Sequence, residues 1–347
     1  EKVVNLFTFI AEEVREILAE LGFKRLNDII GRNDLLKQVS RGTSNLDDLD
    51  LSPLLVQADP GENKRYSLPN IINKISPNLD EKIYEDIKNQ IKKNDNIIFD
   101  YKIKNVDRAI GTRLSHYIYK KFGKDKIKNN SIIINLLGSA GQSLGAFGIK
   151  GLKLNVIGDA NDYVGKGLSG ATIVVKPPYE SNLVSHENTI IGNTVLYGAT
   201  SGKLFAAGQS GERFAVRNSG AEAVIEGCDS NGCEYMTGGS VVILGKVGDN
   251  FAAGMTGGMA FIYDPNKEFE NYVNPNSVIW QSVETEYWVN FLKKLIQEHL
   301  IETKSEVAKK ILDNFHTEIK NFKQVCPKEM LDKLTNPIQL KTKIFGT

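Results

Sequence analysis

The N-terminal residues carry apolar side chains three and four positions apart, with charged residues between them. This spacing predicts an amphipathic helix over residues 2–21, ended by Gly22, and a short second helix over residues 26–30. Two such helices cannot cover an apolar stripe of this length, so we expect its partner to lie outside this chain or in another subunit. The stripe comprises Val3, Val4, Phe7, Ile10, Val14, Ile17, Leu18 and Leu21.

Residues 43–105 are rich in Asn and Asp and are interrupted by prolines, which indicates a connector. Within it, apolar residues recur at every fourth position over residues 79–91, which predicts a helix that packs through a single apolar stripe. Alternating apolar and polar positions over residues 99–103 predict a strand. A further helix is expected over residues 107–122, ended by Gly123.

Glycine is concentrated in the middle of the chain, where 24 of the 31 glycines lie between Gly138 and Gly258. Seven short β-rich runs, each ending on a turn residue, recur there at intervals of 15–19 residues. Self-similarity with a period near 20 predicts a solenoid. The runs end at Gly158, Pro177, Gly192, Gly208, Gly227, Gly245 and Asp264.

The residue content of the repeats decides between two kinds of solenoid. A leucine-rich repeat would place leucines at fixed positions, whereas these coils are rich in Gly, Val, Ile, Ala and Thr. We therefore predict a mainly β fold, with a right-handed parallel β-helix over residues 106–265. Its strands should be three to five residues long. Turns such as that at Gly220 should need a positive φ, which glycine adopts without a Cβ penalty.

The apolar interior of such a rod must be covered at both ends, and the flanking helical segments are the expected caps. We interpret residues 266–347 as a C-terminal helical cap and tail. One helix is expected around residues 288–296. The sequence TKSE at residues 303–306 is typical of a capping box and predicts the start of a second helix.

The chain has 347 residues, of which 41% are hydrophobic and 24% charged, and its formal net charge is +1. These values are typical of a globular protein, and the balanced charge gives no electrostatic reason to propose nucleic acid as a partner. No apolar run has the length of a membrane span and no signal peptide is evident, so we expect no membrane partner and an intracellular location. Residue 1 is Glu, so we expect a processed chain or a piece of a longer one.

Two motifs that could carry chemistry are better explained by structure. Residues 165–170 match the dinucleotide motif GxGxxG, but the β-branched residues after them predict a strand where that motif needs a helix. Cys228 and Cys233 supply two thiolates where a metal or cluster site needs three or four, and Cys326 lies far along the chain. We expect buried or half-buried thiols in a reducing compartment.

The other polar candidates also indicate structural roles. We expect the four dispersed histidines to have surface or packing roles rather than acid–base chemistry. They are His116, His186, His299 and His316. Four charged residues within one repeat are expected to form ion pairs across successive coils, and these are Glu212, Arg213, Arg217 and Glu222. The sequence thus predicts no catalytic, cofactor-binding or metal-binding residue.

Six segments of the glycine-rich region carry a resemblance to a known family. They are residues 138–147, 160–167, 191–194, 197–200, 211–219 and 233–239. Together they closely resemble the C-terminal glycine-repeat domain of the glutamate synthase large subunit, in its ferredoxin-dependent type. Outside that domain, residues 1–42 resemble the last helices of the enzyme's flavin-binding barrel, and residues 285–330 resemble its closing helices.

The resemblance implies the C-terminal structural portion of an oxidoreductase that makes two L-glutamate from L-glutamine and 2-oxoglutarate, using reduced ferredoxin. The amidotransferase domain and the flavin domain, with FMN and a 3Fe-4S cluster, would then be missing partners in the same polypeptide. This portion should brace those domains, bind no cofactor and be inactive in isolation. The excess of Lys, Asn and Ile suits an AT-rich genome, which favours a plastid stroma or a bacterial cytoplasm.

Two alternatives remain open at this point. The electron donor implied by the resemblance could be a pyridine nucleotide instead of ferredoxin. The chain could also be a stand-alone β-helix structural subunit of another redox complex, because similar glycine-repeat domains resemble a subunit of formylmethanofuran dehydrogenase. The barrel-like N-terminus argues against this second alternative.

Overall fold

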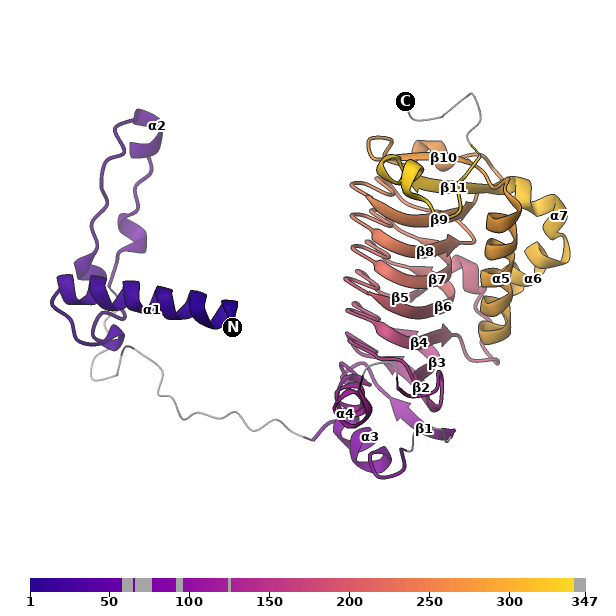
Figure 1. The fold of residues 1–347 in the computed structure, drawn as a ribbon, viewed down its shortest axis with the longest axis horizontal. Coiled ribbons are helices and arrows are strands. Elements are labelled where there is room, and N and C mark those ends of the chain that lie inside the picture. The colour runs from indigo at the N-terminus through magenta and orange to yellow at the C-terminus, as the bar shows by residue number, and fades with distance from the viewer. Residues whose placement is uncertain (58–64, 66–76, 92–95, 124–125, 340–347) are drawn as a thin grey trace. The chain divides into compact units, whose positions relative to one another are not determined.

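The structure is a computed structural model that describes residues 1–57, 65, 77–91, 96–123 and 126–339 (Figure 1). The chain divides into two compact units, Glu1–Ser76 and Pro77–Thr347, which are treated separately below. The division falls inside the predicted connector, whose residues 58–64, 66–76 and 92–95 lie outside the described residues.

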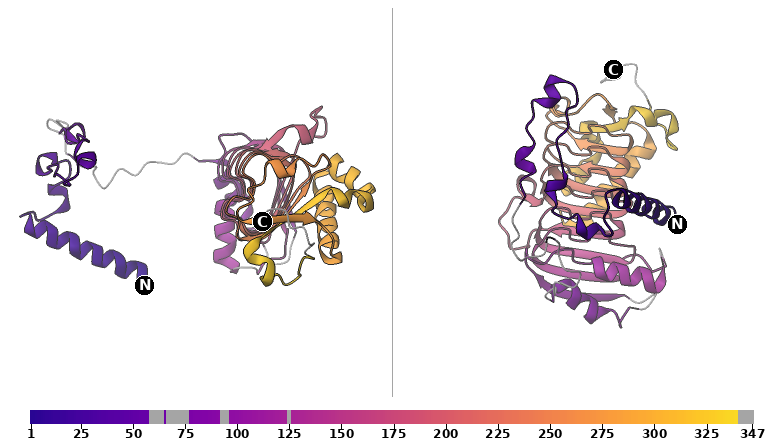
Figure 2. Two further views of the ribbon diagram at one scale, coloured as in Figure 1. Left: turned by 90° about the horizontal axis from the view of Figure 1, so that it is seen from above. Right: turned by 90° about the vertical axis from the view of Figure 1, so that its left-hand side faces the viewer.

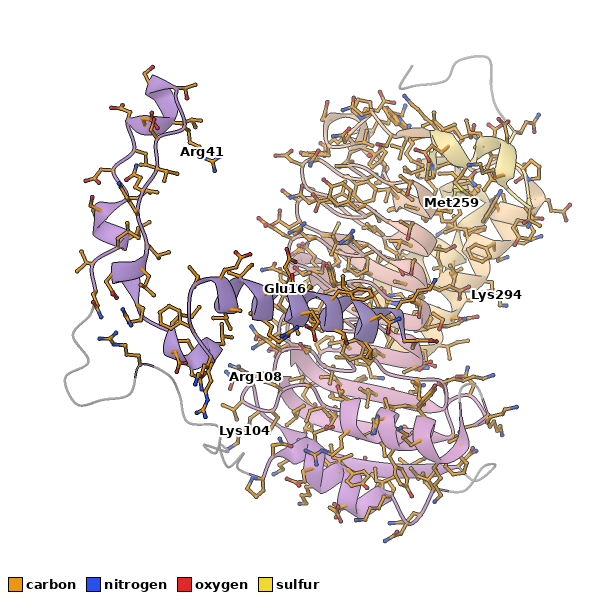
Figure 3. All side chains as sticks on the ribbon, turned by 60° about the vertical axis from the view of Figure 1, so that its left-hand side comes forward. Glu16, Arg41, Lys104, Arg108, Met259 and Lys294 are labelled. Atoms are coloured by element: carbon orange, nitrogen blue, oxygen red, sulfur yellow. The ribbon has the colours of Figure 1, made fainter. Side chains whose placement is uncertain are left out.

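The first unit is built on α1 (Lys2–Glu20), which confirms the predicted amphipathic helix. Gly22 ends it in a Schellman motif: its φ is +78°, its N–H donates to Ala19 O, and the N–H of Phe23 donates to Leu18 O. Leu18 is buried, but most of the apolar stripe is exposed, and side chains project all around the helix (Figure 3). Short helices follow: η1 (Leu26–Asp28), η2 (Asn33–Leu35), α2 (Ser44–Asp47) and η3 (Ser52–Leu54).

The second unit is a stack of parallel strands, which confirms the predicted β-helix (Figures 1 and 2). Strands β1 to β9 pair in parallel in chain order, except that the short β5 pairs with β3 and β6. Seen from above, the coils lie over one another (Figure 2). The strands are β1 (Ile97–Ile103), β2 (Ile132–Ala140), β3 (Leu152–Ala160), β4 (Ser169–Lys176), β5 (Thr189–Ile191), β6 (Ser201–Ser210), β7 (Ser219–Cys228), β8 (Thr237–Ile243) and β9 (Gly257–Tyr263).

Most strands are longer than the three to five residues predicted, because several of them continue through a corner of the coil. Gly138, Gly158 and Gly208 lie inside strands with φ values of +129°, +148° and +146°. A Cβ at Gly158 would lie 2.0 Å from Gly138 O of the preceding coil. Glycine is therefore needed at this corner, both for its φ and for the close approach of the neighbouring main chain.

A second corner uses left-handed residues that are mostly not glycine, which corrects the expectation that glycine supplies the turns. Within the described residues, six coils have positive φ at three alternate turn positions. The N–H groups of Arg213 and Arg217 donate to the next coil and that of Ala215 to the preceding one, so these turns also link the coils. The turns are residues 143–147, 163–167, 194–198, 213–217, 231–235 and 250–254.

Two helices cover the N-terminal end of the rod, α3 (Leu79–Ile87) and α4 (Thr112–Phe122), and their apolar residues share one core with the first coils. The helix predicted over residues 107–122 begins only at Thr112, because Ala109 and Gly111 have positive φ. Asp80 of α3 fixes this start, since its carboxylate accepts the N–H groups of Gly111 at 2.6 Å and Arg113 at 3.1 Å. The carboxylate thereby joins the two helices.

The C-terminal end is closed by two strands that the sequence did not predict. β11 (Phe322–Pro327) pairs antiparallel with β9, and β10 (Val278–Ser282) pairs antiparallel with β11.

Within the described residues, no helix combines the length and the apolar run that a bilayer crossing requires. The remaining short helices are η4 (Ser185–Glu187), η5 (Phe269–Asn271), η6 (Ile319–Asn321) and η7 (Lys328–Lys333).

The C-terminal helices lie along the side of the rod and not over its end, which corrects their predicted role as caps (Figure 1). The reason is a row of apolar side chains on the outer face of the sheet, which α5 buries with Trp288, Leu292 and Ile296. The row is Val174, Phe205, Val224, Val242 and Phe261. The helices are α5 (Glu286–Thr303), α6 (Glu306–Asp313) and α7 (Phe315–Glu318).

The sequence predicted that the turn at Gly220 needs a positive φ, but the structure shows that this glycine is needed for the close packing of coils. Its φ is not in the left-handed region, but a Cβ there would lie 2.1 Å from Thr200 O. Gly220→Val should therefore destabilise the protein by about 3 kcal/mol or more in a denaturant titration. Gly198→Ala is the control, because its φ is +65° and its Cβ would meet nothing within 4 Å. It should cost only about 1 kcal/mol, and equal losses for both variants would contradict the packing argument.

Candidate functional site

Residues 165–170, the GxGxxG segment, form a turn of the solenoid that leads into a strand. Gly165, Gly167 and Gly170 have positive φ, and β4 begins at Ser169. A Cβ at Gly167 would lie 2.6 Å from the Phe147 ring of the preceding coil, so this glycine leaves space for an aromatic side chain. The predicted strand is confirmed. No helix begins within residues 165–176, all of which the structure describes, so no helix N-terminus faces these glycines.

The three cysteines are buried free thiols, as predicted. Burial raises the pKa of Cys228 and of Cys326 to about 12 and raises the pKa of Cys233 well above its ordinary value. They are therefore protonated at neutral pH, which disfavours nucleophilic attack. Across the described ranges, no group of three or more His, Cys, Asp or Glu side chains is placed to hold a metal ion.

A cluster of polar side chains lies buried between the sheet and the helices that cover it. We call Glu226 of β7, His299 of α5 and Ser305 before α6 the buried polar cluster; each is 3% exposed or less. The Ser305 hydroxyl donates to Glu226 Oε1 and accepts the N–H of Ala308 at 3.0 Å. His299 Nε2 lies 3.9 Å from Glu226 Oε1, which is too far for a hydrogen bond.

The neighbours of Glu226 keep its carboxylate charged. Burial alone would raise the pKa of Glu226, but its interactions with His299, Ser305 and Ser185 outweigh that effect and hold the pKa below its ordinary value. Glu226 Oε2 and both ring nitrogens of His299 have no hydrogen-bond partner in the part of the chain that the structure describes. A buried carboxylate with so few partners depends on each of them.

The buried polar cluster holds three elements together and is poorly placed for catalysis. It contains a carboxylate, an imidazole and a hydroxyl, the groups used in nucleophilic catalysis. The Ser305 hydroxyl, however, donates to the carboxylate and caps α6, and the whole cluster is closed to solvent. Its geometry therefore joins β7, α5 and α6.

Sequence reasoning found part of this cluster. It assigned His299 a surface or packing role, and the helical spacing from Leu292 and Leu295 places this histidine on the buried face. It put the capping box at residues 303–306, but Thr303 is the last residue of α5 and Ser305 is the true N-cap. Glu226 gave no signal, because β7 is covered on both faces and shows no alternation of apolar and polar positions.

Ion pairs also attach α5 to strands of the solenoid that precede β7. Lys153 of β3 pairs with Glu302 at 2.6 Å, and Lys203 of β6 pairs with Glu298 at 2.5 Å. The Lys176 ammonium donates to Glu302 O at 3.1 Å. Three successive strands of the rod are thus bound to one helix.

Two of the charged residues predicted to pair across coils do so, with partners that the sequence did not identify. Arg213 pairs with Glu234 of the next coil at 2.8 Å, and Glu222 pairs with Lys203 of the preceding coil at 3.0 Å. Exposed pairs of this kind contribute at most about 1 kcal/mol each. They support a structural role for these charges.

The low pKa of Glu226 predicts an acid-dependent loss of stability. Its charged form stabilises the fold above the ordinary glutamate pKa of about 4.3, and this contribution is lost as the pH falls through the lower pKa of the folded state. Glu226→Gln should lower stability at neutral pH by about 1–3 kcal/mol and flatten the acid limb of the curve. Urea titrations across the acid range measure both effects, with the exposed Glu180→Gln as control. A curve for Glu226→Gln that matches the unsubstituted chain would contradict the assignment.

Comparison with known proteins supports the resemblance seen in the sequence. A family model described as GXGXG motif matches residues 80–328. The chain is 59% identical over 340 residues to the glutamate synthase (NADPH) large chain of Azospirillum brasilense, which covers 98% of this chain and 22% of that relative. It is 45% identical over 332 residues to the glutamate synthase (NADH) of Schizosaccharomyces pombe, and this match covers 95% of the chain and 16% of that relative. It is also 45% identical over 328 residues to the ferredoxin-dependent glutamate synthase of Antithamnion sp., and this match covers 94% of the chain and 21% of that relative.

The chain therefore spans between 16% and 22% of the length of these relatives, although nearly all of it is matched. The resemblance to glutamate synthase large subunits is confirmed, and the relatives differ in the electron donor that their names give. Because the family model extends from residue 80 to residue 328, this chain belongs to the GXGXG motif family.

Proposed function

We propose that this chain is the C-terminal structural portion of a glutamate synthase, which makes two L-glutamate from L-glutamine and 2-oxoglutarate. The observation that carries the proposal is the match of 98% of the chain, at 59% identity, to about a fifth of a glutamate synthase large chain. Most of such a polypeptide lies outside this chain, including the amidotransferase and flavin domains. The isolated chain is then inactive.

The role proposed for this portion is to brace the catalytic domains. Its coils are joined by main-chain hydrogen bonds along the strands and again at the left-handed turns, which favours a stiff rod. The exposed apolar stripe of α1 supports a partner elsewhere in the polypeptide, because side chains such as Val3 (66% exposed) and Phe7 (64% exposed) are costly to leave in water.

The proposed chemistry lies outside this chain. The buried thiols and the closed cluster around Glu226 support a portion without catalytic, cofactor-binding or metal-binding residues. FMN and the 3Fe-4S cluster would belong to the flavin domain of the full-length enzyme. Neither nucleic acid nor a membrane is a proposed partner, and the proposed location is a plastid stroma or a bacterial cytoplasm.

Reduced ferredoxin is the donor expected from the sequence resemblance, and NADPH is the competing donor. The identity to the relative named for NADPH is 59%, whereas the identity to the relative named for ferredoxin is 45%. This difference favours testing NADPH first. Assay of the purified full-length enzyme with each reductant in turn would separate the two donors.

The size of the native polypeptide tests the proposal directly. An antibody to residues 138–264 should detect, in source cells, a band several times larger than 38.5 kDa that copurifies with flavin and iron. An unrelated cytosolic protein of known mass serves as the size control. A band at 38.5 kDa would instead favour the alternative, a stand-alone β-helix subunit of another redox complex.

Deletion of residues 138–264 from the full-length enzyme tests the bracing role. The two half-reactions should become uncoupled, so that glutamine is hydrolysed without stoichiometric formation of glutamate from 2-oxoglutarate. The ratio of the two rates measures the effect, and Gly198→Ala, expected to leave the rod intact, should keep the ratio near that of the unaltered enzyme. Tight coupling in the deletion variant would refute the bracing role.

A further inference from the structure

One coil of the solenoid carries an insertion. The left-handed turns recur every 18–20 residues, but Tyr163 and Thr194 are 31 residues apart, and residues 177–188 between β4 and β5 account for the difference. In repeat proteins, such insertions form loops on one face, often the face that binds a partner. The insertion is therefore the first place to look for an interaction surface.

The insertion is firmly anchored although its tip is exposed. Gln209 of β6 donates from its side chain to His186 O at 2.7 Å and from its N–H to Asn188 O at 2.8 Å. Three apolar side chains nevertheless face solvent: Tyr179 is 99% exposed, Leu183 60% and Val184 47%. A loop that is fixed at its base and apolar at its tip is preorganised for binding.

The insertion and the solenoid border a half-open cavity of about 430 Å³, which we call the apolar hollow. Gly138, Gly158 and Ala207 line it, and none of these three residues has a side chain larger than a methyl group. A partner can therefore approach the main chain closely there. Most of the lining surface is apolar, although Asp159 also lines the hollow. The apolar lining residues include Ile157, Pro177, Pro178, Leu183 and Ile190.

A second cavity of about 330 Å³ continues the first, and we call it the acidic hollow. The two share Ser139, Asp159, Thr189 and Ile190, so they form one groove. Asp162 also lines the second cavity, and together with Asp159 it makes that end negative. Asp159 and the hydroxyl-bearing Ser139 and Thr189 thus lie where the two hollows meet, with Leu183 on the apolar side and Asp162 on the acidic side.

We propose that this groove binds an extended segment of the same polypeptide, lying outside this chain, that presents an apolar side chain next to a lysine or arginine. The apolar side chain fits the apolar hollow, the cation fits beside Asp159 and Asp162, and the small residues Gly138, Gly158 and Ala207 admit the main chain of the segment. The inference rests on the proposed function, under which most of the polypeptide lies outside this chain.

Photo-crosslinking in the full-length enzyme tests the groove. With p-benzoylphenylalanine in place of Leu183, irradiation should yield an intramolecular crosslink, mapped by mass spectrometry, to a segment outside residues 1–347 that has an apolar residue beside a lysine or arginine. Asp159→Lys should abolish most of this crosslink, whereas the exposed Asp313→Lys on α6 should not. The same probe at Ile301, which is 66% exposed on α5, should not label that segment.

Several outcomes would overturn the inference. Crosslinks confined to residues 1–347, crosslinks to a second copy or to another protein, or no crosslink at all would each do so. If the native polypeptide is several times larger than 38.5 kDa and has glutamate synthase activity, these results refute the proposed binding at the groove but not the proposed function. A native band at 38.5 kDa would refute both.

Discussion

The structure depends on the close approach of main chain to main chain between successive coils. Parallel strands stack at about 4.8 Å, which leaves no space for a side chain where one coil crosses another at a corner. Glycine meets this constraint at Gly158, where a Cβ would lie 2.0 Å from a carbonyl oxygen, and at Gly220, where it would lie 2.1 Å away. The same approach allows coil-to-coil hydrogen bonds at the turns as well as along the strands.

Given that constraint, each side chain must point either into the rod or away from it. The inward row from Leu136 through Val156 and Val175 to Ile262 fills the interior with aliphatic groups. The outward row from Val174 to Phe261 is also apolar and would be exposed without α5 and α6. Few polar groups lie beneath these helices, and those that do link the helices to the sheet.

The repeat could be predicted because every coil obeys the same local rule, which leaves glycines and β-branched residues at a regular period. Features that do not repeat were missed: β10 and β11 occur once and run antiparallel. The side-on position of α5 was missed because strands covered on both faces show no alternation from which a second layer could be inferred. The positive φ of Arg213 and Ala215 could not be predicted, because the residues themselves do not favour it. Hydrogen bonds to neighbouring coils stabilise this conformation there. Glu226 and Ser305 lie 79 positions apart in sequence, and only the packed fold brings them together.

Helix α5 also bears on how the length of this rod can change in evolution. Its 18 residues extend about 27 Å and contact β4, β6, β7 and β8, while Glu302 reaches Lys153 of β3. Duplication or loss of one whole coil is ordinarily the simplest change for a repeat protein. Between β3 and β6 such a change would alter the separation of Lys153 and Lys203 by one strand spacing and leave Glu298 or Glu302 without its partner. The number of coils between β3 and β6 is thereby constrained by a helix that is not itself part of the repeat.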